Sequence, residues 1–124
     1  MAVYDWNTIE PESVTDLYQR KIAQGHQLSV ARLEVGKGSI TRAHRHPHEE
    51  VIVLLQGRWL FRFTDREVVL EPNQILTIAP GLEHSSETLE DVVAIDVCTP
   101  TRDDWNNGDD RGLHEDPDRW LWAV

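Results

Sequence analysis

Short segments of alternating apolar and polar residues, each ended by a turn signal, fill the chain between Leu28 and Val97. These segments are residues 28–35, 51–55, 58–63, 67–71, 75–79 and 91–97. In the third segment, Trp59, Phe61 and Phe63 alternate with polar or smaller positions, as a half-buried strand requires. No helical period persists long enough to compete. The pattern predicts an all-β fold, in which evenly spaced strands close into a sandwich or barrel.

A length of 124 residues predicts one domain. We divide it into an N-terminal arm (1–27), a barrel (28–100) and an acidic, tryptophan-containing C-terminal tail (101–124). Residues 9–23 have a loose helical pattern, which predicts either a helix or an extended arm that pairs with a partner subunit. The acidic run after Pro100 is expected to be a solvated tail. We expect Trp120 and Trp122 to dock on the barrel or on a neighbouring subunit.

Charge and composition exclude several classes of function. A formal net charge of -10 argues against nucleic acid, because binding phosphates requires a basic surface. No apolar run approaches the roughly 20 residues that span a bilayer, so we expect no membrane partner. The single cysteine, Cys98, cannot form an intramolecular disulfide and is expected to be a small core residue. The first residues have neither a basic nor an apolar signal region, which favours a cytoplasmic protein.

Histidines and a glutamate are spaced as in a metal site. Residues His44 and His46 lie two apart and would point to the same side of a strand, and a carboxylate and a third imidazole follow. The predicted ligands are His44, His46, Glu50 and His84. Three imidazoles and one carboxylate suit one divalent iron, manganese, nickel, zinc or copper ion, with two positions open for water or substrate. His48 could compete with Glu50, although a role in the turn is the simpler interpretation.

The stretch from Gly38 to Gly57 resembles the first signature of the cupin superfamily, G-x5-H-x-H-x3-E-x6-G, with every fixed position filled. The second signature is matched in part, since Gly81 and His84 are in register and Asn73 replaces a glycine. Asparagine also adopts positive φ, so this exchange is tolerable. The resemblance implies a single-domain cupin, a double-stranded β-helix or jelly-roll barrel that binds a metal.

Residues 94–105, AIDVCTPTRDDW, resemble the end of single-domain cupins typified by a pectin-degradation protein that converts unsaturated uronates to linear ketones. The resemblance implies that Asp96 and Arg102 line the pocket as catalytic residues, while Cys98 replaces an aromatic residue of that family. Glu50 departs from a glutamine that is common there. The alternative for Asp96 is an ion pair with Arg102 across the turn, and Trp105 could simply cover the end of the barrel.

We therefore expect an enzyme that isomerises or opens the ring of a small carboxylated substrate, with Asp96 as proton carrier. The alternatives are a non-heme iron dioxygenase, favoured by Glu50, and a non-catalytic cupin that binds a small molecule. The resemblance also implies a homodimer. Candidate pocket-wall residues are Arg32, Arg42, Trp59 and Arg62. The two isolated histidines, His26 and His114, are expected to be surface residues without a role.

Overall fold

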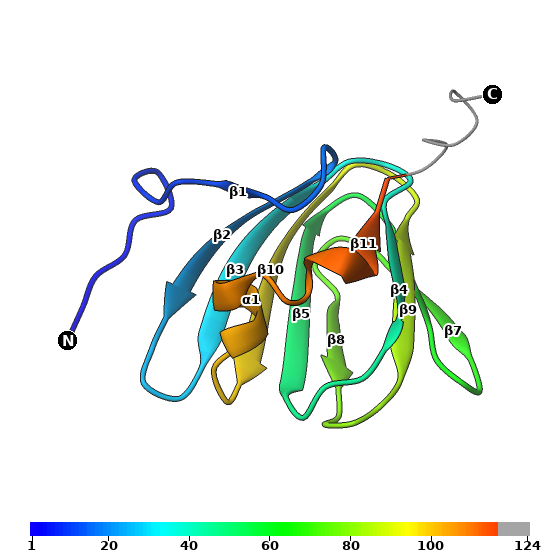
Figure 1. Cartoon of the computed structure of the whole chain (residues 1–124). Coiled ribbons are helices and arrows are strands. Elements are labelled where there is room, and N and C mark those ends of the chain that lie inside the picture. The colour runs from blue at the N-terminus through cyan, green and yellow to red at the C-terminus, as the bar shows by residue number, and fades with distance from the viewer. Residues whose placement is uncertain (117–124) are drawn as a thin grey trace.

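The computed structural model describes residues 1–116, which form two antiparallel sheets facing each other (Figure 1). One sheet has the order β1-β2-β3-β10-β5-β8 and the other β11-β4-β9-β6-β7. The strands are β1 (Glu12–Ser13), β2 (Tyr18–Gln24), β3 (Ser29–Val35), β4 (Ile40–His44), β5 (Glu49–Gln56), β6 (Trp59–Arg62), β7 (Glu67–Leu70), β8 (Ile75–Ile78), β9 (His84–Thr88), β10 (Val92–Thr99) and β11 (His114–Glu115). Two short helices, α1 (Asp103–Asn107) and 3-10 helix η1 (Arg111–Leu113), lie between β10 and β11.

The core lies between the sheets and consists of every second side chain of the central strands. On β5 the side chains of Ile52 and Leu54 are buried, and on β10 those of Ala94 and Cys98 are buried. This period of two is the pattern in the sequence, so the predicted all-β barrel is confirmed. Among residues 1–116, no helix is long and apolar enough to cross a membrane.

Two turns need residues that adopt positive φ. At the β5–β6 turn, Gly57 has φ 90°, and a Cβ there would lie 2.1 Å from the carbonyl oxygen of Asp91. Only glycine fits so close an approach of two backbones. Before β8, Asn73 has φ 71°, as its place in the second cupin signature predicted.

The expected helix over residues 9–23 is wrong. This segment contains β1 and β2, and β2 pairs with β3 of its own chain from Tyr18↔Val35 to Gln24↔Ser29. Arg20 occupies an inward position of β2. A charged residue at such a position interrupts the alternation of apolar and polar residues by which a strand is recognised in a sequence. The strand β2 therefore belongs to the barrel sheet, although it lies before the boundary predicted at residue 27.

The expected solvated tail is also wrong for residues 101–116, which we call the strap. The strap runs from β10 of the six-stranded sheet to β11 of the five-stranded sheet, and β11 pairs with β4 through His114↔Thr41 (Figure 1). Its Trp105 is 5% exposed and its Asp110 is 3% exposed. Asp110 could leave water because the buried Arg20 neutralises it, and Arg102 likewise pairs with the half-buried Asp104, whereas Asp103, Asp109 and Glu115 remain exposed. The tryptophans Trp120 and Trp122 lie outside the described residues.

Candidate metal centre

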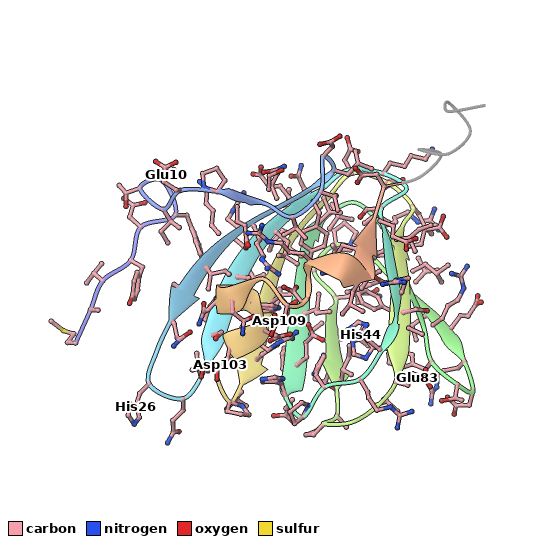
Figure 2. All side chains as sticks on the ribbon, in the orientation of Figure 1. Glu10, His26, His44, Glu83, Asp103 and Asp109 are labelled. Atoms are coloured by element: carbon pink, nitrogen blue, oxygen red, sulfur yellow. The ribbon has the colours of Figure 1, made fainter. Side chains whose placement is uncertain are left out.

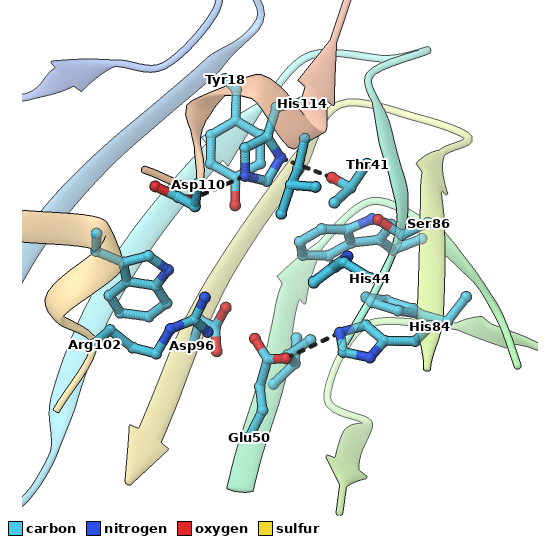
Figure 3. Close-up of a pocket in the computed structure, with 15 residues that line it drawn as sticks. Tyr18, Thr41, His44, Glu50, His84, Ser86, Asp96, Arg102, Asp110 and His114 are labelled. Atoms are coloured by element: carbon cyan, nitrogen blue, oxygen red, sulfur yellow. Dashed lines mark hydrogen bonds and ion pairs between the residues drawn. The ribbon is translucent and has the colours of Figure 1, made fainter. Parts of the chain in front are cut away.

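Three histidines, His44, His46 and His84, form a cluster, and Figure 3 shows two of them, His44 and His84, side by side. His44 ends β4 and His84 begins β9, and these two residues are paired directly across the two strands. His46 follows two residues after His44, where the chain leaves the sheet. One ring nitrogen from each histidine lies within 4.8 Å of the others. The spacing in the sequence thus predicted this cluster.

Hydrogen bonds orient two of the rings for metal binding. Nδ1 of His44 lies 2.7 Å from the carbonyl oxygen of Arg42, and Nδ1 of His84 lies 2.8 Å from that of Leu82. A carbonyl oxygen only accepts, so each Nδ1 carries the proton and each Nε2 keeps its lone pair. Both ring nitrogens of His46 are buried without a hydrogen-bond partner in the described structure. Three such imidazoles fit a transition-metal cation.

Glu50 on β5 reaches the cluster from the opposite sheet. Its Oε1 lies 3.4 Å from Nε2 of His46 and 3.5 Å from Nε2 of His84. Burial alone would raise the pKa of Glu50, but its interactions with His46, His84 and Asp96 outweigh burial and lower it well below the usual range. Glu50 is therefore ionised beside the histidines. Nε2 of His48 instead lies 3.2 Å from the carbonyl oxygen of Thr101, and His48 is not part of the cluster.

A second buried acid lies next to Glu50. Ligand atoms of Glu50, Asp96 and Cys98 all lie within 4.8 Å of one another. Burial, together with the charge of Glu50, raises the pKa of Asp96 well above the usual range, which favours the protonated form of this carboxyl group. Cys98 donates from Sγ to Oδ1 of Asp96 over 3.7 Å, and burial raises the pKa of its thiol. Cys98 is a fully buried core residue, as expected.

The ion pair between Asp96 and Arg102, which the sequence offered as the alternative to a catalytic role, is not formed. Arg102 donates to Asp104 through Nε over 2.8 Å and through Nη2 over 2.7 Å, and its Nη1 contacts Sγ of Cys98 at 3.4 Å. Its guanidinium also lies 4.6 Å from the ring centroid of Trp105. Asp104 is only two residues away, so it outcompetes the more distant Asp96. Both predicted catalytic residues nevertheless line the same cavity.

This cavity, of about 40 Å³, extends from the histidines toward the strap (Figure 3). Of the predicted wall residues, Trp59 lines it, whereas Arg32, Arg42 and Arg62 do not. Residues that the sequence did not single out also line it: Tyr18, Thr41, Ser86, Asp110 and His114.

The expectation for His114 is wrong, because it is buried in the cavity wall. Its Nδ1 lies 2.8 Å from Oγ1 of Thr41 and its Nε2 lies 3.3 Å from Oδ2 of Asp110. The feature of the sequence that could have indicated this contact is Asp110, four residues before His114. The other isolated histidine, His26, lies at the exposed β2–β3 turn, far from His44 in Figure 2.

Comparison with known proteins agrees with this geometry. The sequence profile described as "Cupin domain" matches residues 30–98, more than half of the 124 residues. The chain belongs to the cupin domain family. No curated protein sequence gives a significant match to this cupin.

Solved structures share the fold of this cupin at low sequence identity. KdgF from Halomonas sp. is 23% identical with a TM-score of 0.77, over 84% of this chain and 99% of that chain. An RmlC-like cupin from Shewanella frigidimarina NCIMB 400 is 20% identical with a TM-score of 0.78, over 85% and 96%. Ectoine synthase from P. lautus is 13% identical with a TM-score of 0.76, over 88% and 85%. At these identities the similarity establishes the fold only.

Proposed function

We propose that this cupin is a metal-dependent enzyme that isomerises a small carboxylated substrate, most concretely by opening the ring of an unsaturated sugar acid. The observation that carries the proposal is the position of Asp96, a carboxyl group buried beside Glu50 in the cavity that the histidine cluster also lines. A buried acid whose pKa is raised is suited to deliver a proton to a substrate. The resemblance of residues 94–105 to cupins that act on uronates supports the substrate class.

We assign His44, His46, His84 and Glu50 to a divalent transition metal. The cation would supply Lewis-acid polarisation of a substrate oxygen. The orphaned nitrogens of His46 support this assignment, since burying them without a partner costs free energy unless an ion binds there.

Ring opening of an unsaturated uronate is balanced as an isomerisation. The hemiacetal hydroxyl loses its proton to water, the bond between C1 and the ring oxygen breaks to leave an aldehyde at C1, and the enolate that results gains a proton at the vinyl carbon to give a ketone. Asp96 donates the proton from its carboxyl oxygen to that carbon, and Glu50 holds the proton of Asp96 until then. Water returns a proton to Asp96 after the step, so no net proton is gained or lost. Arg102 lines the cavity and offers a cation for the substrate carboxylate.

The size of the cavity adds a requirement. A volume of about 40 Å³ holds about three water molecules. A six-carbon acid exceeds this volume, so its binding requires side chains that line the cavity to move.

The test is loss of the ultraviolet absorbance of an unsaturated uronate with fully metallated protein. Asp96→Asn should lower kcat about 10²- to 10⁴-fold, because a general acid contributes that much. The asparagine still offers Glu50 a neutral donor, so bound metal and thermal stability should persist. Asp103→Asn, on the exposed first turn of α1, is the matched control and should leave the rate unchanged. Absence of turnover by the metallated wild type would refute this function.

A dioxygenase is the second candidate, because Glu50 beside three histidines suits a redox-active iron. It predicts that turnover requires both ferrous iron and oxygen. Activity under anaerobic conditions, or with zinc alone, would contradict it. For a non-catalytic binding protein, His84→Ala should remove the metal and leave ligand affinity unchanged.

We also propose a homodimer that forms through the outer face of the six-stranded sheet. Val53 of β5 lies between Ile75 of β8 and Ile95 of β10 in the strand register, and all three point away from the core. Ile75 is 61% exposed. A contiguous apolar face on adjacent strands is typical of an interaction surface.

A further inference from the structure

The end of the cavity near the strap contains a tyrosine whose hydroxyl faces the cavity and has no hydrogen-bond partner among the described residues. Tyr18 faces inward from β2 and is 6% exposed. Within residues 1–116, its hydroxyl makes no hydrogen bond. Figure 3 shows this hydroxyl pointing into the cavity, from the side of His114 toward Asp96. A hydroxyl that faces a cavity without a partner in the protein is free to donate to a ligand that supplies an acceptor.

The ring of Tyr18 is held in place by residues from distant parts of the chain. It packs on His114 with ring centroids 4.3 Å apart. His114 is fixed in turn by Thr41, at 2.8 Å, and by Asp110, at 3.3 Å. Arg20 anchors Asp110 through bonds of 2.6 and 2.9 Å. The hydroxyl therefore loses little freedom when it binds a ligand, which increases the affinity that one hydrogen bond provides.

A second free hydroxyl faces the same cavity. Ser86 on β9 is 5% exposed, lines the cavity, and its side chain makes no hydrogen bond in the described part of the chain. Tyr18 and Ser86 come from opposite sheets and line the same cavity, so a ligand in that cavity lies between them. Two neutral hydroxyl groups bind hydroxyl, carbonyl or carboxylate oxygens and provide no net charge.

We propose that Tyr18, assisted by Ser86, forms a subsite that binds an oxygen of a small hydroxylated carboxylic acid, at the strap end of the cavity. This inference rests on the proposed function in one respect, that the reacting part of the same ligand lies at the histidine cluster. Tyr18 determines which acids bind, because an acid without an oxygen at that end leaves the hydroxyl unpartnered. The strap completes the subsite, because it supplies the His114 ring that positions Tyr18.

The test uses Tyr18→Phe in the full-length, metallated protein. This change keeps the ring and removes only the hydroxyl oxygen. The probes are lactate, glycerate, tartrate and galacturonate, with affinity measured by isothermal titration calorimetry. We expect at least one probe to bind the wild type, and its affinity for Tyr18→Phe to be about tenfold lower, as the loss of one hydrogen bond implies. Tyr4→Phe is the matched control, because the Tyr4 hydroxyl bonds to the carbonyl oxygen of Gln24 outside the cavity.

Thermal unfolding without ligand separates binding from a structural role. An unpartnered hydroxyl predicts that Tyr18→Phe is at least as stable as the wild type. Lower stability than Tyr4→Phe would show that the hydroxyl has a partner in the protein and would overturn the inference. The inference would also be overturned if no probe bound the wild type, or if the wild type and Tyr18→Phe bound the probes equally. Hydroxyl-dependent binding without uronate turnover would support the subsite and refute only the proposed function.

Discussion

Replacing Asp110 by alanine removes the main partner of a buried cation. The guanidinium of Arg20 is 1% exposed and donates to Asp110 at 2.6 and 2.9 Å, to Glu12 at 2.7 and 3.3 Å, and to the carbonyl oxygen of Trp105 at 3.5 Å. Breaking a buried ion pair from one side costs about 3–5 kcal/mol, because a charge remains without its partner. Glu12 still neutralises part of that charge, so the lower end of this range, about 3 kcal/mol, is expected.

Thermal unfolding and hydrogen exchange measure this effect. For a chain of this size, a loss of about 3 kcal/mol lowers the melting temperature by on the order of 10 °C. Amide exchange should accelerate first in the strap, because Asp110 also holds His114 of β11. Asp109→Ala is the matched control. The Asp109 carboxylate is next to Asp110 in the chain but exposed, so its removal should change the stability little.

The double variant Arg20→Met, Asp110→Leu distinguishes a buried charge from lost packing. Removing both charges should restore part of the stability that Asp110→Ala loses, since no unpaired cation remains. The reasoning would be refuted if Asp110→Ala cost less than about 1 kcal/mol, or if the double variant were the less stable of the two.

Three further outcomes follow from particular contacts. Gly57→Ala should lower the free energy of unfolding in urea by about 2–4 kcal/mol, because its Cβ would meet the Asp91 carbonyl at φ 90°; an unchanged urea midpoint would contradict this. Hydrogen bonds from Arg20 and His114 outweigh burial and lower the pKa of Asp110 in the folded state. The ionised Asp110 carboxylate therefore stabilises the folded protein at pH values above its ordinary pKa of 3.8, and this stabilisation is lost as the pH falls below 3.8 toward the lower pKa of the folded state. The stability difference between wild type and Asp110→Asn should accordingly shrink below about pH 4 in denaturant titrations, and a constant difference would contradict it. Val53→Arg on the outer sheet face should convert the proposed dimer to a monomer in sedimentation, and a wild type that is monomeric at every concentration would refute the dimer.

Local patterns in the sequence determined the barrel and the histidine cluster. Alternation along β5 and β10 predicted the buried faces, and turn residues such as Gly57 and Asn73 marked the ends of strands. These features depend on a residue and its near neighbours. The two-residue spacing of His44 and His46 is also a relation between near neighbours in the chain, which is why the cluster could be predicted without a structure.

Only the tertiary structure decided the wall of the cavity and the position of the strap. Arg20 and Asp110 are 90 positions apart in the chain, and each by itself resembles a solvated charge. Their burial depends on meeting each other, which no local pattern encodes. The same holds for Tyr18, which looked helical, and for His114, which looked isolated, until β2 and β11 brought them together at one end of the cavity. Pairing between distant charges and rings, rather than hydrophobic periodicity, therefore determines how this cupin closes its candidate site.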